Sequence, residues 1–203
     1  MIKLKRLLRS VISNIYITYN RLRLTVMGIK FGKNCNIIGN LDIFREGKGD
    51  IVIGDDFNFS SGRFVNPISR NIKGCIHLND KAHIIIGANV GISSACIWAH
   101  NSITIGNNVK IGSDCIIVDS DCHSIDYVLR QNVKTDIENK CNIPIVISDD
   151  VLIGARCILL KGSSVGARSV IGAGSIVTNS IPADCIAAGN PCKFIKHINF
   201  KNQ

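Results

Sequence analysis

The sequence predicts an all-β fold: a parallel β-helix shaped as a three-sided prism, with a short amphipathic helix before it and a basic tail after it. Three observations predict this fold. Aliphatic residues repeat every six positions, glycine directly follows many of them, and isoleucine, which favours strands over helices, is in large excess. Of 203 residues, 36 are isoleucine, 11 leucine and 14 valine, enough for one domain with a sizeable core.

The six-residue repeat is clearest near the end of the chain. Six residues at this spacing are all aliphatic, namely Ile147, Ile153, Leu159, Val165, Ile171 and Val177. With an aliphatic fraction of about 0.3, such a series arises by chance on the order of once in a thousand trials for a given phase. Three of the six residues that follow them are glycine, and most residues four positions later are small. This period fits neither an amphipathic helix nor a hairpin meander.

A prism accounts for this pattern. Each hexapeptide makes one short strand and one corner, and three make a coil of about 18 residues. The aliphatic side chain points inward and stacks on its equivalent one coil away, and the glycine permits a sharp corner. Parallel stacking satisfies the backbone groups and leaves unpaired edges only at the ends. The turns of a glycine-punctuated β-sandwich, the alternative, would not hold this phase over 36 residues.

The repeat divides the chain into three predicted parts, which are a helical segment at 1–30, the β-helix domain at 31–190 and a tail at 191–203. Apolar residues fall near helical spacing over residues 2–27. Residues 119–143 break the six-residue phase and are rich in charge and asparagine. A long non-repeating insertion in a compact domain is usually functional, so we expect a loop that projects from the prism and carries function.

The net charge of +9 is concentrated at the N-terminus. Residues 1–41 hold eight basic residues and no acidic one, and the other 16 basic residues are balanced by 15 acidic ones. Aromatic residues make up only 5% of the chain, so a nucleic-acid groove on the folded body is not expected. The basic helix is expected to pack on the first coil or on a neighbouring subunit, with an anionic membrane surface as the sharper alternative.

The cysteines and the apolar runs bear on the compartment. Nine cysteines without a C-x-x-C pair argue against a disulfide framework or a zinc knuckle, and favour a reducing cytoplasm. No uncharged apolar run reaches the ~18 residues of a membrane span. The first 20 residues begin like a signal peptide, but Ser13, Asn14 and Thr18 interrupt the apolar part and no cleavage motif follows. We expect a cytoplasmic protein, free or peripheral at the inner membrane.

Two stretches resemble a known family. The run IGARCILLKGSSVGARSVIGAGSIVT at 153–178 resembles the last coils of the hexapeptide-repeat acyltransferases, and AAGNPCK at 187–193 resembles their A-G-N-P-x-K ending. The closest subgroup is the maltose, galactoside and nodulation O-acetyltransferases, with their relatives in polysaccharide gene clusters. The resemblance covers residues 80–198 and implies a left-handed helix, against the usual crossover rule. It also implies acetyl-CoA as donor, no metal, and a homotrimer with active sites between prisms.

The segment DSDCHSID at 119–126 lies where that family carries its catalytic histidine, and His123-Ser-Ile-Asp resembles the family's H-P-x-D, with Ser124 in place of proline. A histidine in solution titrates near ~6.5, which suits a general base. A sugar hydroxyl is a poor nucleophile until a base takes its proton, whereas a thioester is already activated. The resemblance therefore implies direct transfer, with His123 as base and Asp119, Asp121 or Asp126 orienting the imidazole.

The resemblance also implies which residues bind the two substrates. Coenzyme A would lie in the groove between two prisms, held by backbone amides and, at its phosphates, by lysines. The family often has a basic residue at the position of Asn179 and a tryptophan at that of Leu152. The expected donor-binding residues are Ala155, Ala173, Thr178, Asn179, Lys193 and Lys196. The expected acceptor-binding residues are Ser93, Ser94 and Asp126.

Several other interpretations remain open. Serine O-acetyltransferase and amino-sugar N-acetyltransferase share the fold, although these enzymes usually carry an additional N-terminal domain. A carbonic anhydrase would need three convergent histidines, and the chain has no H-x-x-x-x-H. A non-catalytic binding scaffold would leave loop 119–143 and the basic tail without a role. The best reading is transfer of acetyl to a sugar hydroxyl, in the biosynthesis of O-antigen, capsule or another surface polysaccharide.

The remaining nucleophiles and bases carry weaker signals. Cys122 beside His123 is a candidate for covalent catalysis, but adjacent residues on an extended chain point apart. His77 and His83 are six residues apart and are expected at successive corners. His100 falls in a short break between coils. We expect these three histidines to be surface or packed side chains.

Overall fold

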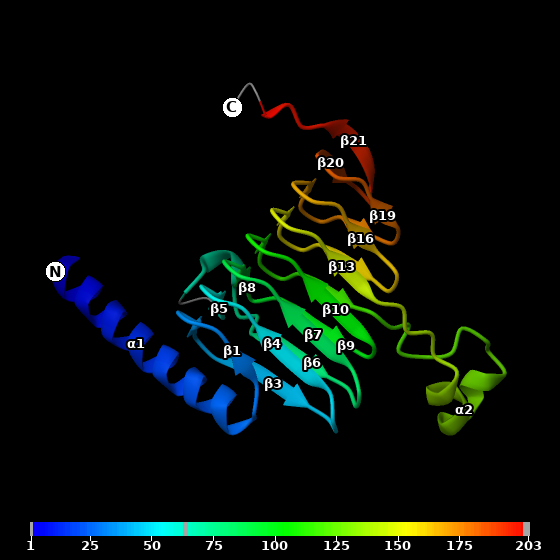
Figure 1. The fold of residues 1–203 in the computed structure, drawn as a ribbon, viewed down its shortest axis with the longest axis horizontal. Helices are drawn as coiled ribbons and strands as arrows, with labels where there is room; N and C mark the ends of the chain where they lie inside the picture. Colours follow the sequence, from blue (N-terminus) through cyan, green and yellow to red (C-terminus); the bar gives the residue numbers. More distant parts are fainter. Residues whose placement is uncertain (1, 63–64, 201–203) are drawn as a thin grey trace.

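The computed structural model describes residues 2–62 and 65–200, and places the side chains of residues 7–62 and 65–200. The chain forms a left-handed parallel β-helix with helix α1 (Ile2–Val26) at its N-terminal end, as predicted (Figure 1). The basic side chains of Lys3, Lys5, Arg6 and Lys201, which contribute to the predicted basic ends, lie outside the described part. No helix of the described residues is long and apolar enough to cross a membrane.

The prism has three faces, each a parallel sheet to which every coil contributes one strand. Face A consists of β1 (Lys30–Phe31), β4 (Asp50–Ile53), β7 (His83–Ile86), β10 (Ser102–Ile105), β13 (Ile145–Ile147), β16 (Ser164–Val165) and β19 (Ser180–Ile181). Face B consists of β2 (Asn36–Ile38), β5 (Asn58–Ser60), β8 (Gly91–Ser93), β11 (Lys110–Ile111), β14 (Leu152–Ile153), β17 (Val170–Ile171), β20 (Cys185–Ala188) and the antiparallel β21 (Lys193–His197). Face C consists of β3 (Leu41–Arg45), β6 (Gly74–Leu78), β9 (Cys96–Ala99), β12 (Ile116–Val118), β15 (Ile158–Leu160) and β18 (Ile176–Val177).

The core is a set of aliphatic columns inside the prism. On face A, Ile105 pairs with Ile147, which pairs with Val165, and all three are at most 1% exposed. Each such side chain contributes about 1.5–3 kcal/mol by leaving water. The small residues of the repeat are also buried, with Cys157, Ser169 and the like filling the narrow interior at the corners. Every sixth residue is therefore held at a fixed depth, and equivalent residues of successive coils stand directly above one another.

The glycines of the repeat make the close approach of successive corners possible. A Cβ atom on Gly154 would lie 2.5 Å from the backbone nitrogen of Ala173, and one on Gly112 would lie 2.5 Å from that of Ala155. Backbone atoms cannot move away as a flexible side chain can, so any larger residue at either glycine would separate the coils.

Helix α1 packs on the first coil through its polar side. Asn20, which is fully buried, donates from Nδ2 to the carbonyls of Ile37 (3.0 Å) and Gly39 (3.1 Å). Arg21 and Arg23 donate to the carbonyls of Cys35 and Leu41. Leu24 is buried in the core, whereas most other apolar side chains of α1 are exposed, and the N-terminal half of the helix extends past the prism (Figure 1). Packing against the first coil is thus the observed arrangement, made by these polar contacts and by Leu24 at the C-terminal half.

Two insertions interrupt the coils at their corners. The first, residues 61–73, joins face B to face C and contains the 3₁₀ helix η1 (Pro67–Ser69). The second, residues 119–144, joins face C to face A and contains η2 (Leu129–Gln131) and α2 (Val133–Glu138). Figure 1 shows the second insertion standing away from the prism. It begins and ends at an antiparallel bridge between Ser120 and Asn142.

Substitution of Asn20 by alanine should release helix α1 without unfolding the prism, because it leaves two carbonyls of the first coil without their donor. We expect a loss of about 1–3 kcal/mol of local stability. Hydrogen exchange should then lose protection in α1 and keep it in the strands. Asn14→Ala, at an exposed position on the same helix, is the control and should leave α1 protected. Unchanged protection in Asn20→Ala would show that this anchor is not needed.

Candidate functional site

Because the coils are in register, residues at equivalent corners form columns along the prism. The B–C corner, where face B passes to face C, carries Ser94, Ser113, Ala155 and Ala173 in successive coils, two residues after Ile92, Ile111, Ile153 and Ile171 of β8, β11, β14 and β17. The C–A corner, where face C passes to face A, carries insertion 119–144 and, two coils later, Thr178. The sequence-predicted site residues therefore fall on two of the three corners.

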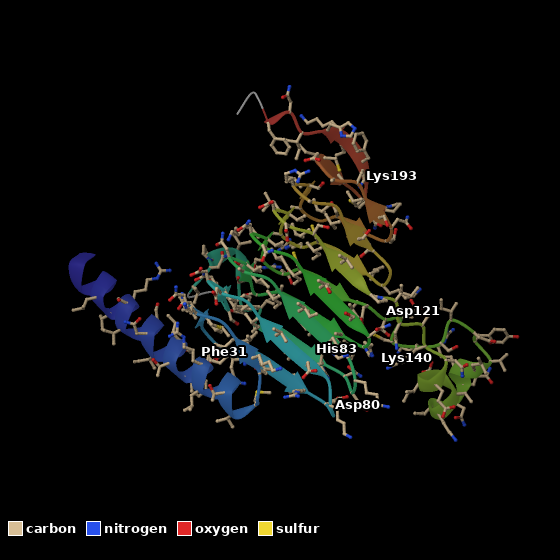
Figure 2. The ribbon with its side chains drawn as sticks, viewed as in Figure 1. Phe31, Asp80, His83, Asp121, Lys140 and Lys193 are labelled. Carbon is tan, nitrogen blue, oxygen red and sulfur yellow. The ribbon has the colours of Figure 1, made fainter. Side chains whose placement is uncertain are left out.

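The predicted donor-binding residues of the B–C corner form one line. The N–H groups of Ala155 and Ala173 make no hydrogen bond within the described residues, whereas their neighbours do: Arg156 N–H donates to Ser113 and Gly174 N–H to Ala155. Lys193 continues this line, because Ile171 pairs with Ala187 and Ala188 pairs with Lys193. Figure 2 shows Lys193 at the end of the prism next to the C-terminal tail. The corner thus offers two unpaired amide donors and then a cation.

The other predicted donor residues are more scattered. Lys196 lies on β21 opposite Ile186, farther from the B–C corner than Lys193. Thr178 and Asn179 are exposed at the C–A corner, at the opposite edge of face C from Ala173. One chain therefore does not bring all six predicted residues together.

The two predicted acceptor serines are held by the first insertion. Ser94 is 1% exposed, and its hydroxyl accepts the Gly62 N–H at 2.9 Å. The Ser93 hydroxyl accepts from the Asn66 side chain at 3.1 Å. In this structure both hydroxyls fasten insertion 61–73 to the B–C corner, so Ser94 in particular is not open to a substrate. Ser93, which is partly exposed, stays at the rim.

His123 lies in the projecting insertion with its side chain 68% exposed, and a carboxylate holds it. Its Nδ1 is 2.7 Å from Oδ2 of Asp136, which lies on α2. The other Asp136 oxygen accepts the Ser124 N–H at 2.6 Å. These two hydrogen bonds lower the pKa of Asp136, the bond from His123 having the larger effect, so the carboxylate is ionised at neutral pH. Nδ1 then carries the proton, and Nε2 presents a free lone pair.

Ser124, where the resembled family has proline, takes part in this arrangement. A proline has no N–H and could not donate to Asp136. Arg130 completes the small lobe by donating to the carbonyls of Ser124 (2.7 Å) and Ile125 (3.3 Å). The insertion therefore holds His123 through hydrogen bonds formed within the insertion.

The carboxylate on His123 is thus not one of the three expected. Asp119 is fully buried and accepts three backbone N–H groups of the preceding corner, those of His100, Asn101 and Ser102, at 2.6–2.8 Å. Asp121 forms an ion pair with Lys161 at 3.4 Å. Asp126 accepts the Val128 N–H at 2.8 Å. Each of these three carboxylates makes another structural contact instead. The insertion folds so that α2 brings Asp136 to His123. Adjacency in sequence pointed to the wrong residues.

His100 lies beside the root of the insertion and packs against Trp98, with ring centroids 4.8 Å apart and the ring planes tilted by 36°. Its Nδ1 is 3.0 Å from Lys140 Nζ, and its Nε2 is 3.9 Å from the Cys122 sulfur. Burial and then the Lys140 charge lower the pKa of His100. Burial raises the pKa of Cys122, which keeps the thiol protonated and argues against a cysteine nucleophile. Figure 2 shows Lys140 and Asp121 close together at this root.

The base and the donor line are separated within one chain. The B–C corner at Ala155 and the C–A corner at Lys161 are six residues apart along an extended strand, or about 20 Å. His123 stands beyond the C–A corner, on an insertion that points away from the prism (Figure 1). Its imidazole can therefore meet a ligand on the B–C corner most directly if that corner belongs to another copy of the chain.

Comparison with known proteins bears on this geometry. The family described as bacterial transferase hexapeptide (six repeats) matches residues 144–179. The chain is 37% identical over 102 residues to the galactoside O-acetyltransferase of Escherichia coli, covering 50% of this chain and 47% of that protein. It is 28% identical to the putative lipopolysaccharide biosynthesis O-acetyl transferase WbbJ of the same organism, covering 85% of this chain and 84% of that protein. The chain is thus similar in sequence to hexapeptide-repeat transferases, among them enzymes named as O-acetyltransferases.

A solved structure supports the fold of this chain. AntD, an N-acyltransferase from Bacillus cereus, superposes with a TM-score of 0.58 at 18% identity, covering 89% of each chain; that structure contains dTDP and 3-hydroxybutyryl-CoA. At this identity the likeness concerns the fold. The chain spans about half the length of the galactoside O-acetyltransferase, so the match to that relative is to the prism rather than to the whole protein.

The structural role of Asp119 leads to a prediction. Asp119→Ala leaves three backbone N–H groups without an acceptor and should cost about 3 kcal/mol, or roughly 10 °C in Tm. Asp126→Ala, in the exposed part of the insertion, is the matched control and should change stability by less than about 0.5 kcal/mol. Urea unfolding of both variants measures the difference. Equal midpoints for the two would mean that the Asp119 carboxylate does not secure this corner.

Proposed function

We propose that this protein transfers an acetyl group from acetyl-coenzyme A to a sugar hydroxyl. The observation that carries the proposal is the pair His123–Asp136, in which the carboxylate binds Nδ1 of an exposed imidazole, so that in the neutral ring the lone pair lies on Nε2. It is supported by the line of unpaired amides at the B–C corner and by the sequence similarity to proteins named as galactoside and lipopolysaccharide O-acetyltransferases. Together they provide a base, a donor-binding edge and a thioester chemistry that needs no further activation.

In the proposed mechanism, Nε2 of His123 accepts the proton of the acceptor hydroxyl as its oxygen attacks the thioester carbon. The carbon–sulfur bond then breaks, and the coenzyme thiolate takes a proton, which the imidazolium can supply. Asp136 stabilises the imidazolium formed on the way, and the Nδ1 hydrogen bond keeps the ring in the tautomer that can accept at Nε2. The N–H groups of Ala155 and Ala173 are placed to bind amide carbonyls of the pantetheine arm, and Lys193 to bind a phosphate.

The active site in this proposal lies between two chains of a homotrimer. It is supported by the separation of His123 from the B–C corner and by the projection of the insertion away from its own prism. Under threefold symmetry each insertion reaches one neighbouring corner and three equivalent sites result. Thr178 and Asn179, on the same corner as the insertion, then border the same cleft from the side of His123.

The acceptor class rests on the relatives. We infer a sugar of a surface polysaccharide, because WbbJ aligns with this chain over most of both sequences. Thiol release from acetyl-coenzyme A, measured over a panel of galactosides, glucosides and rhamnosides with free serine and amino sugars as comparison acceptors, tests it. Turnover on hydroxyls of sugars supports the proposal, and activity confined to serine or to amines would replace it.

Replacement of His123 by alanine should reduce kcat at least about a hundredfold, since general-base catalysis contributes roughly 10²–10⁴. Coenzyme binding, measured by calorimetry, should be unchanged because the B–C corner is untouched. His83→Ala, an exposed histidine on face A, is the control and should remain fully active. Full activity of His123→Ala would exclude this residue as the base.

Asp136→Asn should lower kcat by at least about tenfold with little change in acceptor KM, because an amide can donate to Nδ1 and favour the tautomer with its proton on Nε2. The contribution of Asp136 to the fold of the insertion follows its lowered pKa. It is complete above the ordinary carboxyl value of about 3.9 and is lost only as pH falls below that value. Glu138→Gln, at an exposed position on the same helix, is the control for kcat. An unchanged rate in Asp136→Asn, measured at pH 7, would contradict the orienting role.

A further inference from the structure

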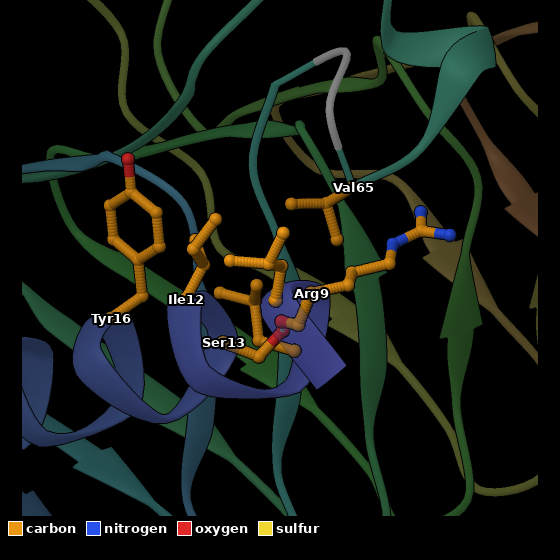
Figure 3. A pocket seen from close by; sticks show the side chains of 7 residues that line it. Arg9, Ile12, Ser13, Tyr16 and Val65 are labelled. Atoms are coloured by element: carbon orange, nitrogen blue, oxygen red, sulfur yellow. Dashed lines mark hydrogen bonds between the residues drawn. The ribbon is translucent and has the colours of Figure 1, made fainter. Parts of the chain in front are cut away.

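A groove runs between helix α1 and the prism, and it consists of two adjoining cavities. The first has a volume of about 500 Å³ and includes Leu8, Ile12 and Ile38 in its lining. The second has a volume of about 430 Å³ and includes Asn40, Ser61, Asn71 and Lys73. Tyr16 and Val65 line both, so the cavities are continuous. Figure 3 shows Val65 facing Arg9 and Ile12 across the first cavity.

The two cavities differ in chemistry. The first is bounded mainly by aliphatic side chains from α1, β2 and the first insertion, with Arg9 and Ser13 as its polar members. The second shares Tyr16 and Val65 with the first and adds amide, hydroxyl and ammonium groups, together with the glycine backbone of the B–C corner. The phenol ring of Tyr16, which has an apolar face and a polar end, stands where the two meet. A ligand that fills the whole groove must therefore be apolar at one end and polar at the other.

The polar cavity is connected to the candidate active site through the B–C corner. Asn40 and Ser61 belong to this corner in the first two coils, and Gly62 donates to Ser94 in the next. The same corner continues upward to Ala155 and Ala173. The polar cavity thus lies on the same corner as the donor line but toward the N-terminal end of the prism, whereas Lys193 lies toward the C-terminal end. We expect the acceptor to enter from the N-terminal end.

We infer that this groove binds the acceptor, and that the acceptor is an amphiphile: a sugar joined to a hydrocarbon chain, with the sugar in the polar cavity and the chain in the apolar one. The inference rests on the proposed function. Each cavity is within the usual range of ligand sites, about 300–1,000 Å³. Asn40, Asn71 and Lys73 supply the donors and acceptors that sugar hydroxyls need.

The apolar cavity also explains an otherwise unfavourable feature of α1. Leu8 and Ile12 are 53% and 51% exposed in the described structure, although they lie on the side of the helix next to the prism. A hydrocarbon chain in the groove would cover them and gain about 25 cal/mol for each Å² of apolar surface removed from water. The C-terminal anchors at Asn20, Arg21 and Arg23 hold the helix at the spacing that keeps the groove open.

The test compares methyl and octyl β-D-galactopyranoside, and the corresponding glucosides, by calorimetric titration below the critical micelle concentration of the octyl compounds. Three proteins are used: the unaltered chain, Ile12→Gln in the apolar cavity and Leu22→Gln as the matched control. Leu22 lies on the same helix, is 63% exposed and lines neither cavity. Glutamine preserves helix propensity, so both variants should keep α1.

Each buried CH₂ group is worth a factor of about three to four in affinity. The octyl compounds should therefore bind at least about tenfold more tightly than the methyl compounds to the unaltered protein and to Leu22→Gln, and less than about threefold more tightly to Ile12→Gln. Equal affinity for both chain lengths in the unaltered protein would overturn the inference. Retention of the ratio in Ile12→Gln, or its loss in both variants, would also overturn it, since either result places the chain outside the groove.

Failure of this inference and failure of the proposed function give different results. Thiol release with the water-soluble sugars of the panel tests acetyl transfer without any hydrocarbon chain. Transfer to those sugars with no preference for octyl compounds would retain the function and remove the amphiphile site. A preference for octyl compounds that Ile12→Gln abolishes, in a protein that acetylates no sugar, would retain the site and remove the function.

Discussion

Everything in this molecule depends on the stacking of equivalent residues in successive coils. The parallel backbone ladder fixes coils about 4.8 Å apart, and the aliphatic columns inside fix which residues stand above one another. A shift by one residue would turn Ile105, Ile147 and Val165 toward solvent, so the register is strongly determined. The corners then align without any contact of their own. Core packing therefore also aligns the backbone amides of the corners, and the donor line at Ala155 and Ala173 requires no additional stabilising contact.

The same regularity limits what the prism can do by itself. A corner repeated in every coil offers small residues and backbone groups at a fixed spacing, which suits an extended ligand with repeated amides. The ionisable residues of the regular corners, such as Asp114 and Arg156, pair with one another, whereas the histidine–carboxylate pair lies where the repeat is interrupted. Insertion 119–144 brings its own carboxylate, with Asp136 held by Ser124 N–H and bonded to His123, and so it needs no help from the coils. Catalytic geometry in this chain is a local property of the insertion, while its position relative to the donor is a property of assembly.

This division explains what the sequence could predict. The six-residue period predicted the prism, the location of the insertion and the alignment of Ala155 with Ala173, because each follows from counting along a regular object, whereas Lys193 in the tail was expected from the family resemblance. Asp136 could not be found in that way. Its helix cap at Asn132 is recognisable, but the turn that brings α2 onto His123 depends on contacts such as Arg130 with the Ser124 carbonyl. Ser93 and Ser94 were matched to the correct corner, yet the first insertion, which is irregular, already occupies their hydroxyls. Asp119 was misjudged for the same reason, since its three N–H donors belong to the preceding coil.

Helix α1 and the two insertions do not follow the six-residue repeat, and each has a distinct position on the prism. Helix α1 and insertion 61–73 enclose the groove at the N-terminal end of the B–C corner, and insertion 119–144 leaves the opposite edge of face C. The coenzyme needs the same contacts whichever acceptor receives its acyl group, so the regular coils can bind it. The acceptor differs from one enzyme to another, and only elements free of the register can change shape without disturbing the core. Acceptor selectivity is therefore expected to reside in α1 and the insertions, where a side chain such as Ile12 can be altered with little effect on the stacking that holds the prism together.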